Sequence, residues 1–264
     1  MNIAPLGVFD SGIGGLTVAR AVFERLPKES VIYFGDTARV PYGPKSPETV
    51  RRYSSEILSF LLGRGVKAVV VACNTSTAHA LTSLKEKSPV PVVGVIEPGA
   101  RAAVTATRSG IIGVIGTAGT IASGAYERAI KALRPDAKVH GQACPLLVPL
   151  VEEGWFEHPA AELIAREYLE PLRRANVDVL VLGCTHYPLL KPLLARVMGS
   201  DVTLVDSAEE TATAVARELE RLNLLANGGA HDHHFVVSDD EPHFRKVGAL
   251  FLGEKLKQVE VVPL

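Results

Sequence analysis

The sequence predicts an α/β protein built from two similar halves, each a mostly parallel sheet between layers of helices. Three observations support this class. Apolar β-branched runs recur along the 264 residues, amphipathic segments separate these runs, and segments of the first half have similar counterparts in the second half. An uninterrupted apolar run, unlike an alternating pattern, is typical of a strand buried on both faces. Strands that alternate with helices are typical of parallel sheets.

The expected elements follow from these patterns in chain order. A helix begins behind Ser46-Pro47-Glu48, because Val50, Tyr53, Ile57 and Leu61 then fall on one face and proline suits a first helical turn. A further helix covers residues 208–222, before a Gly/His-rich loop and a short tail. Strands are expected in the apolar runs 6–9, 31–34, 68–71, 92–95, 111–115, 179–182 and 202–205.

An internal repeat sets the expected domain organisation. The segment 69–75 resembles 179–186, and 7–11 resembles 113–117, so Cys73 and Cys184 occupy equivalent places. We therefore expect two pseudo-symmetric, three-layer α/β domains with the active site in the cleft between them. The first comprises residues 1–97 and 208–264, with the tail packed back on it, and the second comprises residues 98–207.

Composition narrows the function classes. The 28 Lys and Arg residues nearly balance the 29 Asp and Glu residues, without a long basic run, which argues against a nucleic-acid partner. No apolar stretch approaches the roughly 20 residues that cross a bilayer, and the N-terminus lacks signal-peptide features. Three widely spaced cysteines are too few for a disulfide framework. We expect a cytoplasmic protein with free thiols and no membrane partner.

Two cysteines are the strongest candidates for chemistry. Cys73 and Cys184 each end a predicted strand, at the edge where open α/β sheets bind ligands. A helix is expected just after each, at Ser76 and near Pro188, and a helix N-terminus favours a thiolate. The alternative is that both are small buried hydrophobes, but small polar residues follow both. Cys144 has neither feature, and we expect it to be structural.

A thiol on each side of a substrate suits inversion of a stereocentre, because one group removes a proton and the other delivers one. Two alternatives remain open: hydrolysis by Cys184 with His186 as its partner, and a binding protein that holds a small molecule between its halves. Cys184 and His186 supply only part of a zinc site, so no metal is expected.

A glycine-rich loop follows the first predicted strand. Asp10-Ser11-Gly12-Ile13-Gly14-Gly15 superficially matches a dinucleotide fingerprint, with Asp36 after the next strand. Thr17 at the third glycine position and the charge of Asp10 argue against that interpretation. We favour backbone N–H groups that approach an anionic group of the substrate, with Asp10 and Ser11 as side-chain contacts. The alternative for both is a helix N-cap.

Other polar residues are weaker candidates. Tyr42 either lines a pocket or covers the core, and Thr117 and Thr120 either repeat the role of Asp10-Ser11 or cap a helix. Glu152 is either a polar residue of the site or a solvent-exposed acid in a loop, and its position in the sequence does not distinguish the two interpretations. The cluster 231–234 (His-Asp-His-His) lies in the expected Gly-rich loop, where exposure or adventitious metal binding explains it better than a dedicated site.

Several blocks in order resemble the glutamate racemases of the aspartate/glutamate racemase family, over residues 6–222. They are GVFDSGIGGLTV (7–18), YFGD (33–36), VPYG (40–43), ACNT (72–75) and GCTHYP (183–188). The resemblance implies a cofactor-independent isomerase that interconverts L- and D-glutamate and supplies D-glutamate for peptidoglycan. Aspartate is the alternative substrate, since aspartate racemases carry the same cysteine pair.

The resemblance also implies site roles. Cys73 and Cys184 are the acid/base thiols, acting on D- and L-glutamate respectively, with Asp10 and His186 assisting them and Asp36 and Glu152 as secondary polar residues. A homodimer is expected, and the short N-terminus predicts no activation by a cell-wall precursor. The implied substrate-binding residues are Asp10, Ser11, Pro41, Tyr42, Gly43, Cys73, Asn74, Thr75, Thr117, Thr120, Cys184, Thr185 and His186.

Overall fold

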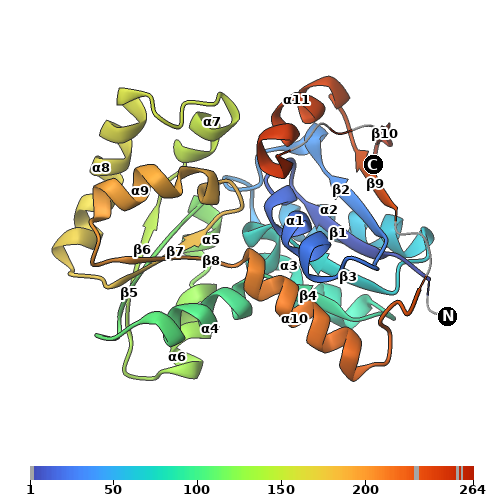
Figure 1. Ribbon diagram of the computed structural model, residues 1–264, viewed down its shortest axis with the longest axis horizontal. Coiled ribbons are helices and arrows are strands. Elements are labelled where there is room, and N and C mark those ends of the chain that lie inside the picture. Colours follow the sequence, from blue (N-terminus) through green and yellow to red (C-terminus); the bar gives the residue numbers. More distant parts are fainter. Residues whose placement is uncertain (1–2, 229–231, 254–255, 257) are drawn as a thin grey trace.

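A computed structural model describes residues 3–228, 232–253, 256 and 258–264. Within them, ten strands form two sheets in which every pairing is parallel (Figure 1). One sheet has the order β10-β9-β2-β1-β3-β4, and the other has the order β6-β5-β7-β8. The predicted α/β class, with helices on both faces of parallel sheets, is therefore confirmed.

The six-stranded sheet is formed by the N-terminal strands and the C-terminal tail. Its strands are β1 (Leu6–Asp10), β2 (Val31–Gly35), β3 (Ala68–Val71), β4 (Val92–Gly94), β9 (His233–Val237) and β10 (Val259–Val261). Leu6 and Val8 pack with α1 (Leu16–Arg25) and α11 (Glu241–Leu252) on one face. Phe9 packs with α2 (Pro47–Gly63) and α3 (Asn74–Lys87) on the other face. Burial on both faces explains the uninterrupted apolar runs.

The four-stranded sheet is covered in the same way. Its strands are β5 (Ile111–Gly116), β6 (Lys138–Ala143), β7 (Val179–Gly183) and β8 (Thr203–Asp206). One face packs against α4 (Ile96–Ala106) and α6 (Ala125–Leu133), and α5 (Ala118–Ala122) follows β5. The other face is covered by α7 (Leu147–Glu152), α8 (Pro159–Arg174) and α9 (Lys191–Met198). Short 3-10 helices, η1 (Thr37–Arg39) and η2 (Tyr187–Leu190), follow β2 and precede α9.

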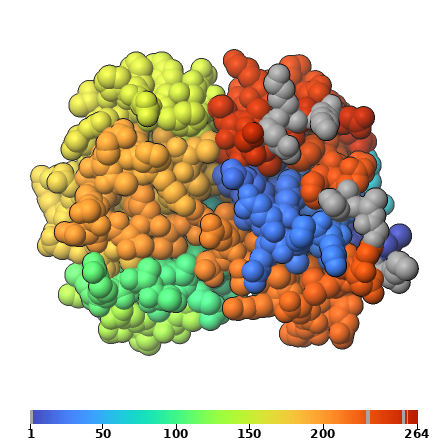
Figure 2. Space-filling model, viewed as in Figure 1, coloured from blue at the N-terminus to red at the C-terminus, as the bar shows by residue number. Residues whose placement is uncertain are grey.

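The internal repeat corresponds to a repeat of topology. The order β2-β1-β3-β4 is equivalent to β6-β5-β7-β8, so β1 corresponds to β5, and β3 corresponds to β7. Helix α10 (Ala208–Arg221) packs against both α1 and α4 and thereby links the two units. Figure 2 shows the two units in contact: red residues on the right meet yellow ones on the left near the top, and orange residues fill the space between the blue and the green ones.

Strands β6, β9 and β10 were not among the expected strands. The polar sequence Lys138–Ala143 lacks an apolar run because β6 is an exposed edge strand. The expectation that His233 and His234 lie in a Gly-rich loop is wrong, since both belong to β9, which pairs with β2. The His233 ring stacks on Phe23 at 3.8 Å between centroids. His231 lies outside the described residues.

The predicted helices behind Ser46 and over residues 208–222 agree with the structure, whereas the helix expected near Pro188 is the 3-10 helix η2, with α9 beginning only at Lys191. Ser46 accepts a hydrogen bond from the Thr49 N–H, and Pro47 occupies the first turn of α2. None of the helices in the described ranges combines the length and the apolar character that a bilayer crossing requires.

A buried ion pair at the amino ends of the strands should affect stability rather than chemistry. Lys67 Nζ lies 2.6 Å from Glu29 Oε2, and both side chains are at most 4% exposed. Lys67→Met leaves the Glu29 carboxylate buried without its cation. We expect the free energy of unfolding to fall by about 3–5 kcal/mol, measured by urea denaturation. Lys28→Met, at an exposed position, is the control, and equal stability of the two variants would contradict the assignment.

Candidate active site

One cavity of about 380 Å³ lies between the two units and is reached by both Cys73 and Cys184. Its walls are the segments that follow β1, β2, β3, β5, β6 and β7, at the carboxyl ends of parallel strands. Predicted residues that line it are Ser11, Pro41, Tyr42, Gly43, Cys73, Asn74, Thr75, Thr117, Glu152, Cys184, Thr185 and His186. Asp10, Asp36 and Thr120 lie behind this lining and contact it.

Cys73 is positioned by the helix that follows it. The residue is the N-cap of α3, and its sulfur accepts a hydrogen bond from the Ser76 N–H at 3.4 Å. Helix α3 therefore begins at Asn74, two residues before the start that the sequence predicts. The sequence did not indicate Cys73 as the N-cap, because cysteine is not a usual residue at that position. Burial and the charge of Asp10 raise the pKa of Cys73 to about 11, although the hydrogen bonds that Cys73 makes with Ser76 and Ser11 oppose the shift. Cys73 therefore carries its proton near neutral pH.

Cys184 has a different environment, with a buried imidazole beside it. Its Sγ lies 3.9 Å from His186 Nδ1, and His186 Nε2 lies 2.8 Å from Glu152 Oε1. Burial alone would lower the pKa of His186, but hydrogen bonds and charges of Cys184 and Glu152 raise it to about 10. His186 is therefore an imidazolium at neutral pH, placed to stabilise negative charge on the Cys184 sulfur.

Asp10 lies close to both thiol environments. Its Oδ2 accepts the Gly12 N–H at 3.0 Å, and its Oδ1 has no hydrogen-bond partner in the described ranges. Burial raises the pKa of Asp10, and the charge of His186 limits the rise. The N-cap alternative is wrong for Asp10 and Ser11, because Gly15 is the N-cap of α1 and no side chain caps it.

The glycine loop has a steric explanation. A Cβ on Gly14 would lie 2.3 Å from Thr185 Oγ1 and 2.4 Å from His186 Nδ1, so only glycine permits this approach. The space beside Gly14, where a pyrophosphate would lie in a dinucleotide site, is filled by the segment after β7. This contact argues against the dinucleotide interpretation.

Asp36 supports the pocket wall from behind. The buried carboxylate accepts hydrogen bonds from Tyr42 Oη, from Arg39 Nε at 2.7 Å and from Ser238 Oγ at 2.9 Å. Tyr42 is both buried and pocket-lining, so the two interpretations of this residue are compatible. Asp36 therefore orients Tyr42, which packs against Cys73.

Three threonine hydroxyls connect the two units at another wall. Thr75 Oγ1 lies 2.9 Å from Thr117 Oγ1 and 3.2 Å from Thr120 Oγ1, and the latter two are 3.0 Å apart. Thr117 also caps α5, so the cap interpretation is correct for it without excluding a place in the pocket.

Sequence reasoning missed part of the lining. Ile13, Val148 and Pro149 form apolar walls, and the Phe251 ring lies edge-on to His186 at 5.4 Å. No local pattern distinguishes these residues from ordinary core residues. Cys144 is buried outside the lining, as a structural cysteine would be.

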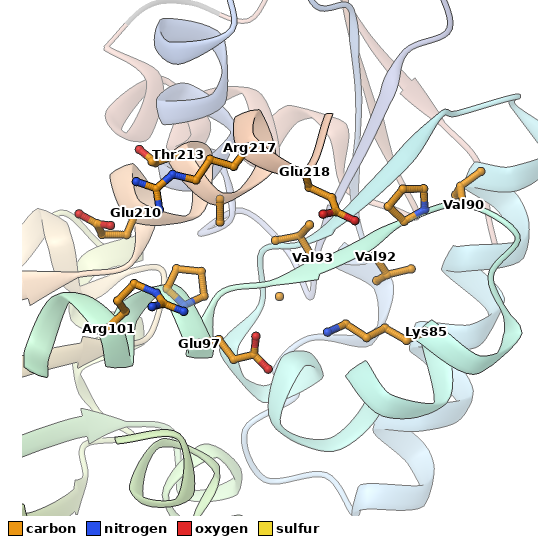
Figure 3. A pocket seen from close by; sticks show the side chains of 14 residues that line it. Lys85, Val90, Val92, Val93, Glu97, Arg101, Glu210, Thr213, Arg217 and Glu218 are labelled. Atoms are coloured by element: carbon orange, nitrogen blue, oxygen red, sulfur yellow. The ribbon is translucent and has the colours of Figure 1, made fainter. Parts of the chain in front are cut away.

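Two other kinds of site come into question among the described residues: a metal site and a hollow beside β4. No group of three or more His, Cys, Asp or Glu side chains in those ranges could hold a metal ion. A second hollow, beside the edge strand β4, is walled by charged side chains that include Lys85, Glu97 and Arg217 (Figure 3). Its lining contains no cysteine and no histidine.

Residues 14–215 match the Asp/Glu/Hydantoin racemase family, so this chain belongs to that family of isomerases. Its relatives include a glutamate racemase of Geobacter metallireducens, which is 57% identical over 98% of this chain and 96% of that protein. A glutamate racemase isoform from Bacillus anthracis shares the fold with a TM-score of 0.96, at 43% identity over 100% of this chain and 99% of that one. The Francisella tularensis glutamate racemase, solved in complex with D-glutamate, aligns with a TM-score of 0.93, at 37% identity over 99% and 98% of the two chains.

The Glu152–His186 pair predicts a pH-dependent contribution to stability. The pKa of His186 is raised from 6.5 to about 10, so this stabilisation is fully present near pH 6.5 and is lost as the pH rises through 10. Glu152→Gln removes the negative charge of Glu152 and with it part of this stabilisation. We expect the stability gap between wild type and variant to be widest near pH 6.5 and to narrow towards pH 10, as measured by urea denaturation.

The matched control is Glu153→Gln, because Glu153 is the exposed neighbour of Glu152. A gap that is constant with pH, or one that Glu153→Gln reproduces, would contradict the assigned charge on His186.

Proposed function

We propose that this chain interconverts L- and D-glutamate by two-base proton transfer between the substrate Cα and the thiols of Cys73 and Cys184. The observation that carries the proposal is that both sulfurs line one cavity, on loops from different sheets. The glutamate racemase relatives, matched over nearly the whole chain, support glutamate as the substrate. The product D-glutamate would enter peptidoglycan synthesis.

In the L-to-D direction, the Cys184 thiolate takes the Cα proton. The electron pair of the broken C–H bond moves into the carboxylate, and the Cys73 thiol then delivers its proton to the opposite face of Cα. Cys73 becomes the thiolate, which begins the reverse reaction on D-glutamate. The two environments suit this direction, because Cys73 carries its proton and Cys184 lies beside an imidazolium.

The developing negative charge on the substrate carboxylate needs stabilisation, because an amino-acid Cα–H is a far weaker acid than a thiol. The cavity offers the hydroxyls of Ser11, Thr75, Thr117 and Thr185, at the carboxyl ends of four different strands. Backbone N–H groups at the start of α3 add further donors. Asp10 is buried behind the lining and interacts with the charge of His186, so it would act on the substrate through His186 and the glycine loop rather than by direct contact.

Three further properties belong to this proposal. The chain works as a homodimer in the cytoplasm and needs no cofactor. Its first domain comprises residues 1–97 and 208–264, consistent with the place of β9 and β10 in the six-stranded sheet. Mass measurement by light scattering tests the dimer, and activity of metal-free, dialysed protein tests the independence from cofactors.

The two-thiol mechanism predicts the effect of single substitutions. In D₂O, the wild type should incorporate solvent deuterium at Cα of both glutamate enantiomers and racemise each. Cys73→Ser or Cys184→Ser should reduce racemisation at least about 10²-fold, because a serine hydroxyl is a much weaker acid than a thiol. The measurement is chiral chromatography with mass detection.

Cys144→Ala is the control and should retain activity, because Cys144 does not line the cavity. Full activity in either serine variant would reject the mechanism. Binding of glutamate by the wild type without exchange would instead indicate a binding protein, and faster turnover of aspartate than of glutamate would reject the substrate assignment.

A further inference from the structure

A single glycine on one side of the cavity is held by two segments from the other side. Gly119, in the first turn of α5, donates its N–H to the Gly43 carbonyl at 2.9 Å. Its own carbonyl oxygen lies 3.1 Å from Nε2 of His79, on α3. Gly43 and His79 belong to the unit of the six-stranded sheet, whereas Gly119 follows β5 of the four-stranded sheet. These two hydrogen bonds therefore cross between the units.

The packing at this seam is too close for a side chain. A Cβ on Gly119 would lie 2.9 Å from the Gly43 oxygen and 3.3 Å from His79 Nε2. A Cβ on Gly43 would lie 2.9 Å from Cβ of Thr117. A small separation of the segments would therefore lengthen both hydrogen bonds at once.

His79 lies one helical turn behind the pocket wall. It is four residues after Thr75, so both side chains project from the same face of α3 towards α5. Thr75 bonds to Thr117 and Thr120, and Thr75 and Thr117 line the cavity, whereas His79 does not. His79 can therefore act on the cavity only through the segment it holds.

The protonation of His79 fits a donor role. Burial lowers the pKa of His79, although its hydrogen bond to Gly119 opposes the shift, so the ring is neutral at pH 7. A neutral imidazole has one N–H, and a carbonyl oxygen only accepts hydrogen bonds. Nε2 is therefore the protonated nitrogen in this contact.

We propose that His79 is a positioning residue that fixes the first turn of α5 against α3 and thereby holds Thr117 at the wall of the substrate cavity. The residue contacts neither thiol and would not take part in proton transfer. Its effect is on the affinity of the cavity for the substrate. The kinetic consequence rests on the proposed function, whereas the structural consequence does not.

Two amide variants differ in reach and separate a hydrogen bond from simple packing. In His79→Gln, the side-chain amide N–H can take the place of the Nε2–H of histidine. In His79→Asn, the side chain is one methylene shorter, so its amide N–H does not reach the Gly119 carbonyl. The first measurement is hydrogen exchange of segment 117–123 by mass spectrometry, without substrate. We expect His79→Asn to exchange about fivefold faster than wild type and His79→Gln to stay within about twofold.

The second measurement is steady-state kinetics with both glutamate enantiomers. His79→Asn should raise KM about fivefold with kcat within twofold, and His79→Gln should restore KM. Glu86→Gln, at an exposed position on the same helix, is the control and should match wild type in both measurements.

Equal exchange in His79→Asn and wild type would overturn the proposal, as would a loss confined to kcat. Equal defects in the two amide variants would also overturn it, because packing rather than the hydrogen bond would then be responsible. If the wild type does not racemise glutamate, the proposed function fails, and hydrogen exchange alone still decides the role of His79.

Discussion

Contact between the loop after β1 and the segment after β7 is the constraint on which the rest of the site depends. Gly14 lies so close to Thr185 and His186 that a Cβ would overlap both side chains. This approach brings the carboxyl ends of two separate sheets together, with Cys73 and Cys184 on one cavity. A repeated topology alone would give two equivalent cysteines, each facing its own solvent-exposed edge.

The two equivalent cysteines are chemically unequal because their neighbours differ. Cys73 is a helix cap whose pKa is raised by burial and by Asp10. Cys184 has an imidazolium two residues later in the chain, held in turn by a carboxylate from α7. The cavity therefore has a protonated thiol on one side and a thiol beside an imidazolium on the other, and the proposed two-base transfer calls for such an inequality.

In the described structure, a buried ion pair and the cavity lie at opposite ends of the parallel strands. At the amino ends, Glu29 and Lys67 form a buried ion pair. At the carboxyl ends, polar side chains face the cavity and are held from behind by residues that do not enter it, as Asp36 holds Tyr42. His79 extends this arrangement to the seam between the units. Parallel strands produce the division because all of their carboxyl ends meet at one edge.

The sequence by itself determined the α/β class, the internal repeat, the central strands and the two cysteines that follow them, because these are local patterns of apolar residues along one element. It could not identify the edge strand β6, whose exposed residues lack such a pattern. Only the tertiary structure brought Glu152 to His186, Ser238 to Asp36 and His79 to Gly119. The partners in these contacts lie on different elements, and packing of helices against two sheets, rather than spacing along the chain, sets their distances.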